Sequence, residues 1–353
     1  MPQITGKRTT PNKELRIRVT EDEEQLLFRY RDQKSLLEKE CEVSGIDPKS
    51  VRHYWYKSKM FSIFAKDGDK SLTDLKDTLI KGMSKYSPKY KEIKRKPQKD
   101  SHCLVLDPAD IHIGKLAEKY ETGEDYNNVI AINRVIDGVN VIIGRASMFN
   151  IDKIVLIIGN DILHTDNTKR TTTSGTPQDT DGQWYSNFLL AQKLYVDIIE
   201  RLVTVADVHV IHNPSNHDFM TGWYLAQVIQ VWFKGNKNVT FNTSISHRKA
   251  FVYHSNLIGS THGDGAKEQD LPLLMAQEFK KEWGDTSHRY IYTHHIHHKK
   301  SKDYIGVTVE SSRSPSGTDS WHHRNGYQHA PKAIEAYLHH PQNGQIARFT
   351  HIF

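Results

Sequence analysis

Four histidines fall within five positions of residues 290–299, Tyr-Ile-Tyr-Thr-His-His-Ile-His-His-Lys, directly after a β-branched and aromatic segment. Neutral imidazole is the commonest metal-binding side chain in proteins. Only His295 and His297 are two residues apart with histidine at both ends, because Ile296 occupies the position that any other such pair needs. On a strand, residues with this spacing point to the same side. The run predicts part of a metal centre, with further ligands elsewhere in the chain.

Four more clusters of metal-binding residue types lie upstream, each just after a segment that predicts a buried strand. Each cluster alone is explained by an ordinary polar loop or by a hydrogen-bonded histidine. Their shared position matters more, because the carboxyl ends of strands in an α/β sheet form its ligand crevice. We therefore expect the clusters to converge. They are Asp110-Ile-His112, Asp161-Ile-Leu-His164, Asn216-His217-Asp218 and Thr261-His262-Gly263.

The elements that must position these clusters alternate between strand and helix beyond residue 100. Helices are expected at residues 126–147, 184–205 and 222–233, which predicts a layered α/β domain. The polar loop at residues 168–182 is expected near the site because it follows His164. The expected strands are residues 102–106, 153–158, 208–212, 257–260, 289–293, 306–310, 334–338 and 345–350.

Composition limits the class of protein and the kind of ligand. The chain has 353 residues, of which 37% are hydrophobic, enough for one large domain and a small companion. No secretory or membrane-spanning segment is recognisable, so we expect a soluble, cytoplasmic protein without a membrane partner. The two cysteines, Cys41 and Cys103, form no Cys-x-x-Cys motif, so a metal must use nitrogen and oxygen ligands.

Taken together, the five clusters resemble the calcineurin-like metallophosphoesterase superfamily. Its pattern is Asp-x-His, Gly-Asp-x-x-Asp/His, Gly-Asn-His-Asp/Glu, a lone His, and Gly-His-x-His, and the match covers about residues 100–300. The resemblance implies an α/β/β/α layered sandwich over residues 101–353. His164 stands where some relatives have Asp, and a histidine there is similar to the SbcD-type DNA exonuclease branch.

The resemblance also implies a dinuclear centre that hydrolyses phosphate esters with a metal-bridging hydroxide. His217 corresponds to the catalytic histidine that assists the leaving group, and His164 is a second catalytic candidate that orients the substrate. The ligand types favour Mn²⁺, with Fe, Zn²⁺ and Mg²⁺ as alternatives. The implied ligands are Asp110, His112 and His297 for one ion, Asn216, His262 and His295 for the other, and Asp161 as the bridge.

Three positions depart from the family pattern without removing a ligand. Asn160 separates Gly159 from Asp161, and Ser215 and His294 each stand where the family has glycine. Glycine permits a positive φ and close backbone approach that serine and histidine tolerate poorly. These departures therefore bear on the backbone geometry of the site. The other histidines, including His254 and His322, match no motif position, so ordinary surface or hydrogen-bonding roles are expected for them.

The positive charge lies at the N-terminal end. Residues 1–100 contain 24 Lys and Arg against 16 Asp and Glu, which leaves 24 against 26 for the remainder. We expect a flexible leader at residues 1–20, a basic helical domain at residues 21–86 and a basic linker at residues 87–100. The asymmetry favours a polyanionic partner such as nucleic acid, with a solvated basic surface as the alternative.

Residues 35–57 resemble a helix-turn-helix unit. The first helix ends at Gly45, and the second is expected to begin after Asp47 with Pro48 in its first turn. A helical hairpin that merely packs on its neighbour explains the pattern equally well. If the unit binds DNA, the contacts are predicted at Lys49, Ser50, Arg52, His53, Tyr56 and Lys57.

The sequence thus predicts a metal-dependent phosphodiesterase, in particular a DNA nuclease. A phosphomonoesterase or a protein or nucleotide phosphatase would use the same centre, since one fold supports many substrates. A catalytically idle DNA-binding scaffold is the alternative from another class. A partner ATPase or a homo-oligomer is neither indicated nor excluded.

Overall fold

The computed structural model describes residues 38–39, 41–42, 53–57, 62–66, 88–97 and 99–353. The chain divides into two compact units, Met1–Tyr86 and Ser87–Phe353. The expected leader and most of the expected helical domain lie outside the described residues.

The described part of the first unit contains a β-hairpin. Strand β1 (His53–Lys57) pairs antiparallel with β2 (Ser62–Lys66), and Trp55 lies opposite Phe64 in the register. The predicted second helix is therefore wrong over residues 53–57, where three consecutive aromatic residues favour a paired strand over a helix. Of the predicted DNA contacts, His53, Tyr56 and Lys57 lie on this strand, while Lys49, Ser50 and Arg52 lie outside the described residues.

A six-stranded sheet forms the first half of the second unit, with the strand order β13-β12-β3-β4-β5-β6. Four strands are parallel: β3 (Ser101–Asp107), β4 (Asn150–Gly159), β5 (Asp207–Asn213) and β6 (Val239–Asn242). Two late strands, β12 (Ala333–His340) and β13 (Gly344–Ile352), extend the sheet antiparallel from β3. The carboxyl ends of β3, β4 and β5 therefore lie at one edge.

A five-stranded sheet forms the other half, with the order β10-β11-β9-β8-β7. Its parallel core is β8 (Asn256–Ser260), β9 (His288–Thr293) and β11 (Val307–Ser311). Strands β7 (Lys249–Tyr253) and β10 (Lys300–Tyr304) pair antiparallel at its two edges.

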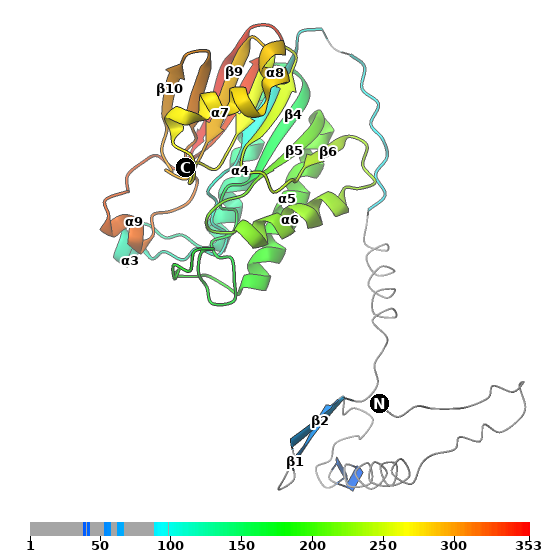
Figure 1. Cartoon of the computed structure of the whole chain (residues 1–353), viewed down its shortest axis with the longest axis vertical. Coiled ribbons are helices and arrows are strands. Elements are labelled where there is room, and N and C mark those ends of the chain that lie inside the picture. The colour runs from blue at the N-terminus through cyan, green and yellow to red at the C-terminus, as the bar shows by residue number, and fades with distance from the viewer. Residues whose placement is uncertain (1–37, 40, 43–52, 58–61, 67–87, 98) are drawn as a thin grey trace, which may run out of the picture. The chain divides into compact units, whose positions relative to one another are not determined.

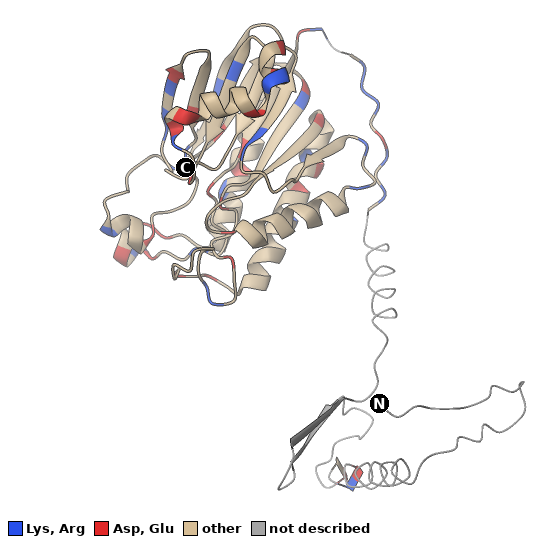
Figure 2. Cartoon of the chain, in the orientation of Figure 1, with Lys and Arg blue, Asp and Glu red and all other residues tan. Residues whose placement is uncertain are grey.

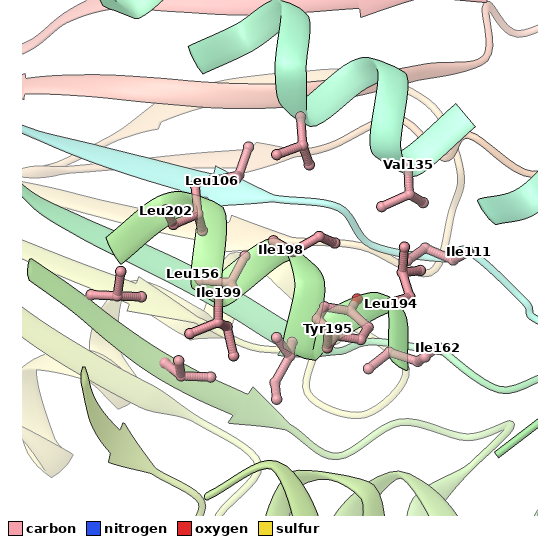
Figure 3. Packing of buried hydrophobic residues seen from close by; sticks show 14 of the residues in the cluster. Leu106, Ile111, Val135, Leu156, Ile162, Leu194, Tyr195, Ile198, Ile199 and Leu202 are labelled. Atoms are coloured by element: carbon pink, nitrogen blue, oxygen red, sulfur yellow. The ribbon is translucent and has the colours of Figure 1, made fainter. Parts of the chain in front are cut away.

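The two sheets pack face to face, and successive side chains along a strand point alternately into the core between the sheets and into the core under the helices. In β3, Leu104 and Leu106 join the core under the helices, whereas Cys103 and Val105 join the core between the sheets. The first core lies under α4 (Asn128–Ala146), α5 (Trp184–Val205) and α6 (Phe219–Trp232), and Figure 3 shows α5 side chains within it. Complete burial of one such side chain stabilises the fold by roughly 1.5 to 3 kcal/mol.

Helices α7 (Leu271–Glu278) and α8 (Lys280–Asp285) cover the five-stranded sheet through a third core that contains Leu257, Met275 and Ile291. The layers are thus helix, sheet, sheet and helix, which confirms the predicted layered α/β class (Figure 1). The sequence did not indicate β6, β7, β10, α7, α8 or two short helices, α3 (Lys119–Thr122) and α9 (Ser320–Arg324). Among the described helices, none has the length and apolar character needed to cross a bilayer.

Residues 88–97 form a basic segment that precedes β3 (Figure 2). The Tyr90 hydroxyl donates to Glu200 at 2.7 Å, the Ile93 amide donates to Asn238 at 2.8 Å, and Arg95 pairs with Asp207. The ring of Tyr90 also stacks on Phe233. This part of the expected linker is therefore held along the rest of the second unit, because two of its side chains and one backbone amide have partners there.

Candidate metal centre

The strand ends bring the predicted site residues together. Asp110 and His112 follow β3, Asp161 follows β4, and His262 follows β8. His295 and His297 lie beyond β9, which ends at Thr293, and both have left-handed backbones with φ of 70° and 58°. The sequence predicted that strand alternation would direct His295 and His297 to the same side. In the structure a left-handed turn places them at the site instead. Three groups have ligand atoms within 4.8 Å of one another: Asp110, His112 and His297; Asp161, His262 and His295; and His112, His164 and His217.

The first group has the form of a cation site. The Nε2 of His297 lies 3.5 Å from Oδ1 of Asp110 and 3.3 Å from Nε2 of His112. Two imidazole nitrogens that face each other use both lone pairs only when a cation lies between them. Oδ1 of Asp110 is also buried without a hydrogen-bond partner among the described residues. The residues present therefore fit a divalent ion.

The second group lies around His262. Its Nε2 is 2.9 Å from Oδ1 of Asn216 and 3.3 Å from Oδ2 of Asp161, and its ring is 5.1 Å from that of His295. The same Oδ2 of Asp161 lies 4.0 Å from Nε2 of His112 in the first group. Asp161 therefore stands between the two groups, where a bridging carboxylate must stand. All seven predicted ligands are adjacent, although metal binding itself stays a prediction.

Backbone strain is concentrated in these ligands. Each left-handed non-glycine residue costs on the order of 1 kcal/mol or more, and such conformations persist where surrounding contacts hold them. Here the Asp110 amide donates to the Asn160 carbonyl at 2.7 Å, and the His112 amide donates to the Asp161 carbonyl at 2.9 Å. Strain of this kind clusters at functional sites. The strained ligands are Asp110 (φ 51°), His112 (52°), Asp161 (58°), His295 (70°) and His297 (58°).

Two of the departures from the family pattern have a clear structural basis. Gly159 has φ 86°, and a Cβ there would overlap the backbone carbonyl of Asn213, so glycine is required one position before Asn160. The hydroxyl of Ser215 accepts a hydrogen bond from the Asp161 amide at 2.8 Å and donates to Asp218 at 2.6 Å. Ser215 therefore supports the backbone of the bridging residue.

The third departure, His294, is a buried residue beside the site. Its Nε2 lies 3.3 Å from Oδ2 of Asp107, and both side chains are fully buried. Burial lowers the pKa of His294 to about 3, so this imidazole is uncharged at neutral pH, and burial raises the pKa of Asp107 well above its usual range. The His294 amide donates to the His262 carbonyl at 2.8 Å. His294 thus faces Asp107 and supports the backbone of His262.

His217 has a defined tautomer. Its Nδ1 lies 2.9 Å from the His164 carbonyl, and because a carbonyl oxygen only accepts, this nitrogen carries the proton. Nε2 is therefore the nitrogen that can exchange a proton with a substrate. The rings of His164 and His217 stack at 5.2 Å, and burial lowers the pKa of His164, with a further contribution from Lys115. His164 is thus a neutral, buried support for His217.

The charges at the second group are linked. Burial alone would lower the pKa of His262, but Asp161 outweighs this effect and raises it to about 9. Conversely, His262 and His217 hold the pKa of Asp161 below its usual range, although burial opposes this. In the absence of a cation, Asp161 and His262 form an ion pair, and an ion that binds Nε2 of His262 must displace a proton.

Three residues near the site were missed by the sequence interpretation. The Lys115 ammonium is buried and lies 2.9 Å from Oδ2 of Asp319, and it also donates to the Gly317 carbonyl at 3.1 Å. Nδ1 of His322 lies 2.7 Å from Oδ1 of Asp319, and its ring stacks on His297 at 5.0 Å. Nothing in the sequence links Lys115 to a carboxylate 204 positions later.

The loop at residues 168–182 begins beside the site, as expected. The Thr173 amide donates to the Asn216 carbonyl at 3.1 Å, and its hydroxyl donates to Asp166 at 2.9 Å. Asp166 in turn accepts from the Thr221 amide at 2.7 Å in the first turn of α6. These bonds tie the loop to a predicted ligand and to a helix.

Comparisons with known proteins give likeness of structure only. No family model and no curated protein matches the sequence. A structure of an archaeal phosphodiesterase is 9% identical with a TM-score of 0.33, covering 71% of this chain and 99% of that chain. Zinc-bound Vps29 from Entamoeba histolytica is 14% identical with a TM-score of 0.31, covering 70% and 98%. A predicted phosphoesterase from Streptococcus pneumoniae is 13% identical with a TM-score of 0.24, covering 46% and 91%.

What the fold and the site define is a class: a four-layer α/β protein with adjoining groups of Asp, Asn and His side chains that can hold divalent metal ions.

Proposed function

We propose that this protein is a metal-dependent phosphodiesterase that acts on nucleic acid, with DNA as the expected substrate. The observation that carries the proposal is the pair of ligand groups that meet at Asp161, with Nε2 of His112 and Nε2 of His262 at 4.0 and 3.3 Å from its Oδ2. A shared carboxylate between two nitrogen-rich groups is the arrangement of two-metal hydrolytic sites.

Each side chain of the centre has a definite task in this proposal. The first ion would be held by Asp110, His112 and His297, the second by Asn216, His262 and His295, with Asp161 between them. When bound, such a pair withdraws charge from a phosphoryl group and lowers the pKa of water.

His217 is the residue proposed to move a proton. Its Nδ1 is held by the His164 carbonyl, and its own amide donates to Oδ1 of Asp161 at 3.0 Å. Both bonds fix the ring beside the ligands and direct Nε2 toward a leaving oxygen. General acid assistance of this kind contributes roughly 10²- to 10⁴-fold to the rate. His164, stacked on His217, keeps this orientation and is itself uncharged because burial lowers its pKa.

Charge favours a diester over a monoester substrate. A monoester phosphate carries about two negative charges near neutral pH, whereas a diester carries one. Among the described residues, Lys115 is the cation that acts on the pKa of the site histidines, and its charge is neutralised by Asp319. Lys115 therefore adds little surplus positive charge to the centre, and a singly charged diester needs less of it than a monoester does.

The basic N-terminal part of the chain supports nucleic acid as the substrate. Residues 1–100 carry 24 Lys and Arg against 16 Asp and Glu. Within them, residues 88–97 are fixed along the second unit and include Lys89, Lys91, Lys94 and Lys96. Lysines that contact phosphates give binding that weakens steeply with salt.

The proposal is tested by supplying linear duplex DNA, single-stranded DNA and 4-nitrophenyl phosphate with Mn²⁺, Mg²⁺ or Zn²⁺. We expect DNA cleavage to exceed monoester hydrolysis in at least one metal. Efficient monoester hydrolysis without DNA cleavage would instead indicate a phosphomonoesterase or phosphatase. DNA binding without any hydrolysis would indicate an idle scaffold.

His217→Ala adds a test of the chemical step. Turnover should fall by roughly 10²-fold or more, while the metal content measured by elemental analysis stays at the wild-type level. His254→Asn is the matched control, because His254 is an exposed histidine with φ 49° in the β7–β8 turn, at the opposite end of β8 from His262. Loss of metal in His217→Ala would contradict the role assigned to it.

A further inference from the structure

A row of aromatic rings leads outward from the candidate metal centre. The ring of His112 lies 5.2 Å from that of His297, and His297 stacks on His322 at 5.0 Å with an interplanar angle of 15°. The next ring, Trp321, meets His322 edge-on at 5.0 Å, and Tyr327 follows at 5.7 Å. Two predicted ligands are thus connected by ring contacts to the short helix α9.

Exposure rises along this row. His112 is buried, and the side chains of His297 and His322 are 16% and 20% exposed. Trp321 and Tyr327 are 58% and 66% exposed. Single exposed aromatic residues are normal on a protein surface. An exposed Trp and Tyr in contact with each other, at the end of a row that starts at predicted metal ligands, form a surface continuous with the site.

Helix α9 is held rigidly for so short an element. Oδ1 of Asp319 accepts the His322 amide at 2.8 Å at its start, while Oδ2 pairs with the buried Lys115. The preceding segment is fixed as well, because the Ser314 hydroxyl donates to the Asp110 carbonyl at 2.7 Å. The helix is therefore tied to the backbone of a predicted ligand, and its rings are positioned before any ligand binds.

The same helix carries positive charge. Arg324 ends α9 and forms no ion pair with any residue that the structure describes. Helix α3 lies beside α9 (Figure 1). It carries a further exposed aromatic residue, Tyr120. Exposed rings together with an unpaired guanidinium are the features by which proteins hold unpaired nucleotides, through base stacking and phosphate contacts.

From these observations we infer that Trp321 and Tyr327 form a stacking platform for an unpaired nucleobase next to the scissile phosphate. This inference rests on the proposed phosphodiesterase function and specifies its substrate as a nucleic-acid strand with a base free to leave its stack. Trp321 supplies the main face, Tyr327 its continuation, and Arg324 a contact for the adjoining phosphate. The platform is tolerant of sequence, because every base has a π face.

Two esters with the same leaving group test the platform on the full-length chain. Thymidine 5′-(4-nitrophenyl phosphate) carries a base, and methyl 4-nitrophenyl phosphate does not. In Trp321→Ala, the ratio of kcat/KM for the thymidine ester to that for the methyl ester should fall about 5- to 150-fold, because stacking contributes about 1 to 3 kcal/mol per base. The change should lie in KM, and Trp321→Phe should restore most of the ratio because a ring remains.

Tyr224→Ala is the control, since Tyr224 is an exposed aromatic residue on α6 with no ring contact to the predicted ligands. Its ratio should equal that of the wild type. An unchanged ratio in Trp321→Ala, or an equal loss on both esters, would overturn the platform.

If the wild type hydrolyses neither ester, the proposed function fails, and the platform is judged separately by fluorescence anisotropy with labelled oligothymidylate. The Kd should then rise about 5- to 150-fold in Trp321→Ala. Equal binding by the two proteins, or no binding by the wild type, would overturn the platform as well.

Discussion

The buried Lys115–Asp319 pair connects the site to α9, and its removal has a predictable cost. The ammonium lies 2.9 Å from the carboxylate, with side-chain exposures of 1% for Lys115 and 14% for Asp319. Asp319→Asn keeps the size of the side chain and an oxygen for the His322 amide, but it leaves the cation with only the Gly317 carbonyl. Removing one partner of a buried pair costs about 3 to 5 kcal/mol, and the lower value applies because Asp319 is partly exposed.

Thermal unfolding measures this cost. For a domain of this size, a loss of about 3 kcal/mol lowers Tm by roughly 6 to 12 °C. Glu268→Gln, which breaks the exposed pair with Lys300, should cost less than about 1 kcal/mol. Lys115→Met combined with Asp319→Asn should recover part of the loss, because no stranded cation remains. A loss in Asp319→Asn no greater than that in Glu268→Gln would refute the reasoning.

The same variant has a defined pH dependence. Although burial opposes it, Lys115 and His322 hold the pKa of Asp319 below its usual range. A carboxyl whose pKa is lower in the folded than in the unfolded protein stabilises the fold at pH values above its unfolded pKa of about 3.9. This stabilisation is lost as the pH falls toward the folded pKa. The difference in Tm between wild type and Asp319→Asn should therefore be constant above about pH 5 and shrink below about pH 4.

Two further predictions concern the backbone and the protons of the centre. Gly159→Ala should destabilise the protein by more than Gly175→Ala, because both glycines have positive φ but only at Gly159 would a Cβ overlap Asn213; equal losses of Tm would contradict this. Because the pKa of His262 is raised to about 9, binding of Mn²⁺ must release its proton. Below that pH the affinity should fall about tenfold per unit, and calorimetry in buffers of different ionisation enthalpy should detect about one proton, whereas none would contradict the assignment.

Much of the second unit was predictable, because local patterns set it. Hydrophobic runs such as residues 154–158 are buried on both faces, so the sequence predicts strands there without reference to distant partners. The metal-binding residues follow these runs directly. Parallel pairing then brings Asp110, Asp161 and Asn216 to one edge without further information.

Other features depend on contacts that a local pattern does not contain. The helix expected up to Lys57 is a strand over residues 53–57, because this segment pairs with residues 62–66. The attachment of residues 88–97 depends on Glu200 and Asn238, which lie more than a hundred positions away. The left-handed turn at His295 and His297 also escaped prediction, because strain at a site is sustained by neighbouring elements and not by the local sequence.

The position of Asp161 between the two ligand groups is the central claim, and counting bound ions tests it most directly. Native mass spectrometry of the full-length chain with Mn²⁺ should show two ions per chain in the wild type and in Asp137→Asn, a control whose carboxylate is 63% exposed. Asp161→Asn should retain at most one ion, because the shared carboxylate is lost. No bound ion in the wild type, or two equally tight ions in Asp161→Asn, would contradict the claim.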